Sequence, residues 1–175
     1  DIRTNEWKPY LWKKMTEFYG LYGAKYTPKE MEKAYHKYAD EELEATYKKM
    51  KGKNGISCVD DAEIQLEKVF QRLFTEKGVD ADIALATHAG QMFRVISMKF
   101  EKVYDGVFEL LDTLKKKGKK IYLLSNAQYI FTGYEINALG LTPYFDGIVI
   151  SSNECCKKPS KEFYNVVIER YGLKK

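Results

Sequence analysis

The sequence predicts an α/β protein, with a helical bundle over residues 1–102 followed by part of a parallel-sheet domain over residues 103–175. In the first range, apolar side chains recur every three or four positions, the spacing that lines one face of a helix. In the second range, two short apolar runs, Ile121–Leu124 and Ile148–Ile150, alternate with helix-length segments. Such alternation implies parallel strands joined by right-handed crossovers, and ligands of such sheets bind at the carboxyl ends of the strands.

Amphipathic segments in the first range predict a small bundle of four antiparallel helices. Their apolar stripes are Leu11, Met15, Phe18 and Tyr19; Met31, Tyr35, Tyr38 and Leu43; Leu66, Val69, Phe70, Leu73 and Phe74; and Leu85, Ala89, Met92, Phe93 and Ile96. Thr27, Pro28 and Glu30 supply a hydroxyl cap, a proline and a reciprocal carboxylate in the order typical of a helix start. We expect Asp60 and Asp61 to cap the third helix.

Composition and charge exclude several classes of partner. The 29 Lys and Arg side chains against 25 Asp and Glu leave a formal net charge of +4 with no basic arm, so a nucleic-acid partner is not expected. No apolar run approaches the roughly 18 residues of a membrane span, and the N-terminus has no secretion signal. We therefore expect a cytoplasmic protein without a membrane partner. Cys58, Cys155 and Cys156 lack disulfide or zinc-site spacing and are interpreted as reduced thiols.

A polar stretch follows the first apolar run, where a strand is expected to end and a helix to begin. Ser125 supplies a hydroxyl there, and Asn126, Ala127 and Gln128 carry backbone amides of the helix start. A hydroxyl beside unpaired amides favours a phosphate or carboxylate oxygen. We therefore take Ser125, Asn126 and Ala127 as candidate anion-binding residues. The alternative interpretation is an ordinary helix cap, the commonest use of Ser and Asn at such positions.

A second polar stretch, residues 151–157, follows the other apolar run and leads to Lys158 and Pro159. Neighbouring parallel strands end at the same edge of a sheet, so Lys158 would reach the crevice that holds Ser125. Its ammonium would hold an anion or a nucleophilic carboxylate there as a compact positive charge. Pro159 favours an extended conformation for Lys158. The alternative is a solvated surface lysine, which is our interpretation of Lys157.

Together these segments resemble motifs II and III of the haloacid dehalogenase superfamily. The matching segments are Val107–Leu114, Ile121–Asn126, Ile148–Ser152, Lys158-Pro159 and Phe163-Tyr164. The resemblance implies a partial Rossmann-like core, and the helical range 1–102 resembles the cap inserted between motifs I and II in cap-type-one members. In that family the motif II serine binds an oxygen of the transferring group, and the motif III lysine orients the nucleophilic aspartate. These roles fall on Ser125 and Lys158, beside the amide of Asn126.

The sequence departs from the family pattern at the acidic motifs. The family's nucleophile and its acid–base partner form a D-x-D pair ahead of the cap, and an acidic motif IV follows the lysine. The D-x-D found here, Asp80-Ala81-Asp82, opens a helical stripe, so we interpret both aspartates as helix caps and first-turn charges. Magnesium is the cofactor implied by the family, with its ligands expected outside this chain. Cys155 stands where many relatives have glycine, in the turn before Lys158.

These departures lead to an expectation about the chain itself. In the family topology the motif I strand lies beside the motif II strand, so without it Ile121–Leu124 would expose an unpaired apolar edge. Two buried-type strands also rarely form a stable sheet alone. We therefore expect the chain to be a fragment of a longer protein and to be inactive by itself.

The resemblance implies a hydrolase. The leading hypothesis is a magnesium-dependent phosphatase that acts on a small phosphorylated metabolite through an aspartyl-phosphate, with Ser125 and Lys158 stabilising the phosphoryl group. A metal-independent 2-haloacid dehalogenase and a non-catalytic anion-binding relative stay open as alternatives. In cap-type-one relatives a cap loop closes over the active site, so Tyr22, Lys25 and Tyr26 are candidate substrate-binding residues.

Overall fold

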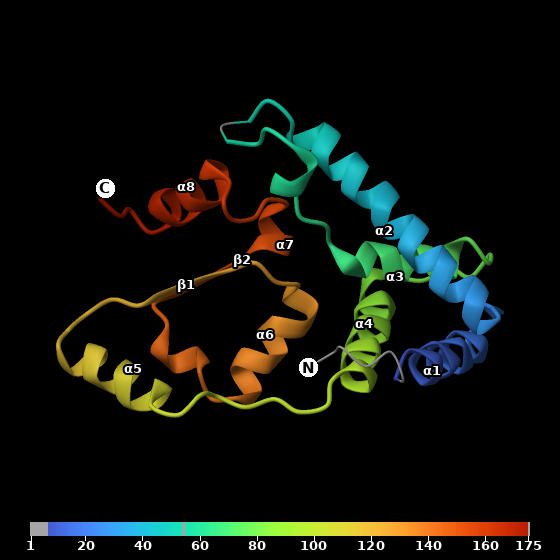
Figure 1. Cartoon of the computed structure of the whole chain (residues 1–175), viewed down its shortest axis with the longest axis horizontal. Coiled ribbons are helices and arrows are strands. Elements are labelled where there is room, and N and C mark those ends of the chain that lie inside the picture. Colours follow the sequence, from blue (N-terminus) through green and yellow to red (C-terminus); the bar gives the residue numbers. More distant parts are fainter. Residues whose placement is uncertain (1–6, 54, 175) are drawn as a thin grey trace. The chain divides into compact units, whose positions relative to one another are not determined.

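A computed structural model of the chain describes residues 7–53 and 55–174, and its contacts divide it into two compact units. Unit 1 consists of residues 1–45 and 65–99, and unit 2 consists of residues 46–64 and 100–175. Figure 1 labels the helices and strands of both units along the chain.

Unit 1 is made of helices, as the apolar periodicity predicts. Its elements are α1 (Lys8–Leu21), most of α2 (Pro28–Met50), α3 (Leu66–Thr75) and α4 (Ile83–Ser97). Aromatic side chains fill its centre: the ring of the buried Tyr19 stacks on Phe74, with 3.9 Å between ring centroids. The Tyr19 hydroxyl donates to the carbonyl of Phe70 at 2.9 Å. Burial raises the pKa of this phenol, which keeps it protonated as a donor.

The starts of α2 and α4 have the capping chemistry that the sequence predicts. The Thr27 hydroxyl accepts from the amide of Glu30 at 3.3 Å, and the Glu30 carboxylate accepts from the amide of Thr27 at 2.7 Å. Asp82 accepts from the amide of Leu85 at 2.8 Å. The interpretation of Asp82 as a cap is therefore confirmed.

The prediction that Asp60 and Asp61 cap α3 is wrong. Both lie in a short 3-10 helix, η2 (Val59–Asp61), which ends before α3 begins. The buried Asp61 carboxylate instead accepts from the amides of Ser57 and Cys58 at 2.8 and 3.1 Å. These bonds lower the pKa of Asp61, and the bond from the Ser57 amide has the largest effect. The aspartate therefore closes the loop before α3 and leaves the helix start uncapped by its side chain.

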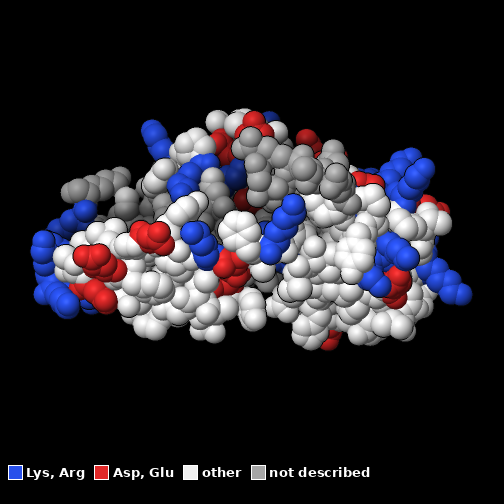
Figure 2. Space-filling view, turned by 60° about the horizontal axis from the view of Figure 1, so that its bottom comes forward, with Lys and Arg blue, Asp and Glu red and all other residues white. Residues whose placement is uncertain are grey.

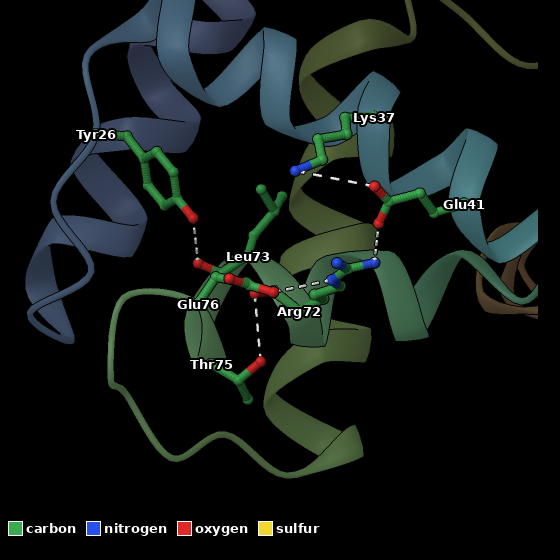
Figure 3. Close-up of polar contacts among 7 residues, drawn as sticks. All are labelled: Tyr26, Lys37, Glu41, Arg72, Leu73, Thr75 and Glu76. Carbon is green, nitrogen blue, oxygen red and sulfur yellow. Dashed lines mark hydrogen bonds and ion pairs between the residues drawn. The ribbon is translucent and has the colours of Figure 1, made fainter.

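Polar contacts join α2 and the loop before it to α3 in unit 1 (Figure 3). The guanidinium of Arg72 on α3 pairs with Glu41 of α2 at 2.6 Å and with Glu76 at 3.2 Å. The Tyr26 hydroxyl, ahead of α2, donates to the carbonyl of Leu73 at 2.8 Å. Exposed ion pairs of this kind contribute roughly 0–1 kcal/mol each. Burial of the aromatic core is thus the larger stabilising term in this unit.

Unit 2 contains the predicted parallel sheet. Its elements after the end of α2 are η2, α5 (Val107–Lys116), β1 (Tyr122–Ser125), α6 (Tyr129–Ala138), η3 (Thr142–Tyr144), β2 (Gly147–Ile150), α7 (Ser151–Glu154) and α8 (Lys161–Arg170). β1 and β2 pair in parallel, with Leu124 opposite Val149 and Ser125 opposite Ile150. Both strands therefore end at the same edge, as predicted. The stretch 151–157, predicted as a polar turn, begins instead with the helical turn α7.

Helix α8 lies on one side of the two strands, and α5 and α6 lie on the other (Figure 1). One buried apolar cluster of unit 2 contains Met50, Ile56, Val149, Cys156, Phe163 and Val167. Because Met50 and Ile56 come from the end of α2 and the loop after it, residues 46–64 pack with unit 2. The predicted domain boundary between residues 1–102 and 103–175 stays a prediction. A helical unit and a small parallel sheet with flanking helices confirm the predicted α/β class.

The charged side chains on the face shown in Figure 2 are of both signs and interspersed. This distribution agrees with the small formal net charge of +4. Within the part of the chain that the structure describes, no helix combines the length and the apolar character that crossing a bilayer requires.

Asp146 holds the opposite end of the sheet, where the chain enters β1 and β2. Its carboxylate accepts from the ammonium of Lys120 at 2.9 Å, the amide of Ile121 at 2.9 Å and the ammonium of Lys115 at 3.0 Å. Its own amide donates to the Ile121 carbonyl at 2.7 Å. The bonds to the carboxylate hold the pKa of Asp146 well below its usual range, and the bond from Lys120 has the largest effect.

We predict that unit 2 loses stability in acid through Asp146. A carboxylate whose pKa is lower in the folded state than in the unfolded state stabilises the folded protein. This stabilisation is complete when the pH is above the unfolded-state pKa, about 3.9, and it is lost as the pH falls toward the folded-state pKa. Urea unfolding followed through NMR signals of β1 should show this loss below about pH 4. Asp146→Asn should be less stable at neutral pH and decline less steeply in acid. Asp105→Asn, at an exposed position of unit 2, is the control; equal slopes for both variants would contradict the prediction.

Candidate anion-binding site

The loop after α7 brings Lys158 to the end of β1. Its ammonium donates to the carbonyl of Leu124 at 2.9 Å, on the residue immediately before Ser125. Lys158 and Ser125 are both half-buried. A lysine ammonium carries three N–H donors, so its bond to Leu124 leaves donors for an anion. The structure thus brings the lysine of one predicted motif to the strand end of the other.

Asn126 holds the main chain of Lys158 from both sides. Its side-chain oxygen accepts from the Lys158 amide at 2.8 Å, and its side-chain nitrogen donates to the Lys158 carbonyl at 3.0 Å. The two partners fix the orientation of the amide group, because one must donate and the other accept. The sequence singled out Asn126 for its backbone amide, and the positioning role of its side chain was missed.

Two buried serines of α7 hold the turn that follows β1. Ser151 accepts from the amide of Ala127 at 2.9 Å, and Ser152 accepts from the amide of Tyr129 at 2.8 Å. Their exposed fractions are 0% and 1%, so water does not compete for these hydroxyls. Ala127 stays a predicted substrate-binding residue, although its amide has this partner within the protein. Both serines directly follow an apolar run, a signal that the sequence analysis did not use.

A carboxylate from the loop before α3 meets the same turn. Glu63 accepts from the hydroxyl of Ser151 at 3.0 Å and from the side-chain nitrogen of Gln128 at 3.1 Å. No spacing in the sequence singles out Glu63, because its partners lie far along the chain. Like the two serines of α7, Glu63 is a residue of this turn that the sequence did not predict.

The three predicted cap-loop residues belong to unit 1. Burial raises the pKa of Tyr26 to about 12, and the ammonium of Lys77 lies 4.4 Å from the centre of its ring. Lys25 is exposed. Tyr22 and His88 line an open hollow of about 700 Å³. Substrate binding by Tyr22, Lys25 and Tyr26 stays a prediction.

The residues present do not fit the magnesium ion that the family resemblance implies. Among residues 7–53 and 55–174, no group of three or more His, Cys, Asp or Glu side chains is arranged to hold a metal ion. Magnesium prefers an octahedron of oxygen ligands, usually with one or two carboxylates. The ammonium of Lys158 repels a cation instead. We therefore assign no step of the chemistry to a metal held by the described residues.

A comparison with known protein families identifies the family of the chain. A sequence model of the haloacid dehalogenase-like hydrolases matches residues 10–175. The chain belongs to this family. The resemblance stated from Ser125 and Lys158 is thereby confirmed at the level of the family, and the chain is a haloacid dehalogenase-like hydrolase by sequence.

Individual relatives of this haloacid dehalogenase-like chain are longer than it is. The HAD-hydrolase YfnB of Bacillus subtilis (strain 168) is 31% identical over 101 residues, which are 58% of this chain and 41% of YfnB. A crystal structure of YfnB bound to magnesium, described as revealing interdomain movement, also matches this chain. The two are 23% identical with a TM-score of 0.42, and the match covers 94% of this chain and 64% of that chain. A predicted phosphatase from Clostridium acetobutylicum matches with 23% identity and a TM-score of 0.39 over 77% and 62%. The chain thus spans less than two thirds of each relative.

We predict that the Asn126 side chain restrains Lys158. Asn126→Ala removes both bonds to the Lys158 main chain, each worth about 1 kcal/mol, so exchange of the Lys158 amide hydrogen should accelerate roughly thirtyfold. Asn126→Asp keeps the acceptor and should fall between wild type and alanine. Asn153→Ala, at an exposed asparagine of α7, is the matched control and should leave this exchange rate unchanged. The same rate in Asn126→Ala and in wild type would refute the restraint.

The turn before Lys158 contains a residue in the left-handed region. Cys155 has φ 58° and ψ 15°, a conformation that glycine adopts easily and other residues adopt at a conformational cost. By its resemblance to the haloacid dehalogenase superfamily, this position corresponds to one where many members are expected to have glycine. The chain therefore keeps the left-handed turn even though it carries a side chain that disfavours it.

We predict that Cys155→Gly stabilises unit 2. Removing Cβ relieves the left-handed penalty of about 1–2 kcal/mol, while the extra freedom of glycine in the unfolded chain takes back about half of it. Cys155→Ala keeps Cβ and should bring no such gain. The free energies of unfolding of both variants in urea test this expectation, and a glycine variant no more stable than the alanine variant would count against it.

Proposed function

We propose that this chain carries the phosphate-binding part of a phosphatase that acts on a small phosphorylated metabolite. The observation that supports the proposal is the Lys158 ammonium, 2.9 Å from the Leu124 carbonyl and therefore beside Ser125. A fixed cation and a hydroxyl at the end of a parallel strand suit a phosphoryl group, because its negative charge is spread over several oxygens. Membership of the hydrolase family is the wider support.

In this proposal the chain's residues position and stabilise the phosphoryl group. The Ser125 hydroxyl and the Asn126 amide donate to its oxygens, and Lys158 offsets its negative charge. The Asn126 side chain and the α7 serines hold these donors in place before substrate arrives, so little reorganisation is needed during the reaction.

The covalent step needs a nucleophilic aspartate. Its carboxylate would form a bond to phosphorus as the ester P–O bond breaks, and the leaving alkoxide would take up a proton; water would then cleave the aspartyl-phosphate. Asp82 of the D-x-D pair caps α4 and is not a candidate. We therefore look for the nucleophile in the complete reading frame that encodes this chain.

We predict that Lys158 is needed for phosphatase activity and that Lys157 is not. The product of the complete reading frame should hydrolyse p-nitrophenyl phosphate in buffer with magnesium, and Lys158→Ala should lower kcat/KM at least about 100-fold because a fixed charge at the phosphoryl group is lost. Lys157→Ala is the matched control, since Lys157 is the neighbour of Lys158 in the chain, is also half-buried and carries the same charge. Equal activity of the two variants would end the assignment of Lys158.

The same preparation separates the two alternatives. Release of halide from a 2-haloacid without added metal, and no phosphate release, would identify a dehalogenase. Binding of inorganic phosphate without turnover of any substrate offered would identify a non-catalytic relative. Either result would replace the phosphatase proposal.

A further inference from the structure

The Glu63 carboxylate is anchored beside the turn that follows β1. The short segment that carries it pairs with the loop leading to Lys158: Ala62 forms an antiparallel bridge with Cys156, and the Glu63 amide donates to the Cys155 carbonyl at 3.1 Å. On the other side of this bridge, the Lys157 amide donates to the Asp61 carbonyl at 3.0 Å. The backbone of Glu63 is therefore fixed to the lysine-bearing loop.

Through Ser151, Glu63 controls the amide of Ala127. The Ser151 hydroxyl lies 3.0 Å from a Glu63 oxygen and 3.1 Å from the Ala127 carbonyl, but it has one proton to donate. A hydrogen bond to a carboxylate is stronger than one to a neutral carbonyl, so the proton goes to Glu63. A lone pair of Ser151 then faces the Ala127 amide, which donates to it at 2.9 Å.

Glu63 also holds the next residue of the turn directly. The side-chain nitrogen of Gln128 donates to the second Glu63 oxygen at 3.1 Å and to the Ile64 carbonyl at 3.0 Å. One carboxylate thus fixes two consecutive residues, Ala127 through Ser151 and Gln128 by its side chain. These are the residues that follow Ser125 and Asn126, the proposed donors to the phosphoryl group.

We infer that Glu63 is a positioning residue of the phosphate-binding turn, residues 125–128. It acts through Ser151 and Gln128 and does not touch the substrate. Without the carboxylate, the Ser151 hydroxyl loses the partner that orients it and Gln128 loses one of its acceptors, so the turn gains freedom. The inference rests on the proposed phosphatase function, because it concerns how Ser125 and Asn126 are positioned to bind a phosphoryl group.

The test uses the complete gene product and compares substitutions at Glu63. Glu63→Ala should lower kcat/KM for p-nitrophenyl phosphate roughly tenfold and raise the Ki of inorganic phosphate by a similar factor, because misplaced donors bind oxygens less well. Glu63→Gln should stay close to wild type. Its amide oxygen accepts from Gln128, and its amide nitrogen donates to Ser151, whose proton turns to Ala127.

Two further variants separate positioning from general stability. Glu154→Ala breaks an ion pair with Arg170, 2.8 Å long, on the same short helix as Ser151, and should lower the melting temperature without changing kcat/KM or Ki. Ser151→Ala interrupts the link from Glu63 to Ala127. It should reproduce the kinetic effect of Glu63→Ala, and the double variant should lose little more, because the two residues act along one path. Ser151→Ala also serves if Glu63→Ala does not fold.

The outcomes distinguish this inference from the function on which it rests. Unchanged kcat/KM and Ki in Glu63→Ala, together with lost activity in Lys158→Ala, would overturn the role of Glu63 and keep the phosphatase. Equal losses in Glu63→Ala and Glu63→Gln would also overturn it. If Lys158→Ala is fully active, the proposed function fails, and hydrogen exchange at the Ala127 amide then tests the role of Glu63 alone. Faster exchange in Glu63→Ala than in wild type would support control of the turn by Glu63. An unchanged exchange rate would overturn it.

Discussion

Parallel pairing of β1 with β2 is the constraint on which the whole site depends. Because parallel strands end at the same edge, the register that sets Ser125 opposite Ile150 places the turn after β1 beside the loop that begins with α7. The contacts of Lys158 with Leu124 and of Asn126 with Lys158 both cross from one strand end to the other. A one-residue slip would turn these side chains to opposite faces, so the site exists in this register alone.

Those features that follow from local pattern were predictable from the sequence. Short apolar runs predicted the two strands, and the order Thr27, Pro28, Glu30 predicted the capping box at the start of α2. Lys158 was singled out because it follows the end of a strand, and its contact with Leu124 at the end of β1 agrees with that reasoning, while its role stays a prediction. Periodicity and caps act over a few positions, so a single sequence displays them.

Features that depend on distant partners were not predictable. Asp61 looked like a helix cap, but its carboxylate finds the closer amides of Ser57 and Cys58 in a turn that the pattern does not encode. Glu63 and Ser151 are 88 residues apart in the chain, and only the folded backbone brings them within 3.0 Å. Each residue alone has the pattern of an ordinary loop position. Their roles come from tertiary packing, which outweighs local preference.

The pairing of amides within the turn changes which groups bind an anion. The sequence suggested that free amides at the start of α6 attract the ligand, yet the amides of Ala127 and Tyr129 donate to buried serines. These two amides therefore already have partners inside the protein, and the proposal gives the anion to the Ser125 hydroxyl, the Asn126 amide and the Lys158 ammonium. A lysine ammonium sits on a flexible stem, so its position depends on how well its loop and its own hydrogen bond to the Leu124 carbonyl hold it. The two bonds that Asn126 makes to the Lys158 main chain hold this loop. In this fold the hydrogen bonds around the turn therefore position the lysine directly, and they would act on a ligand only through the lysine.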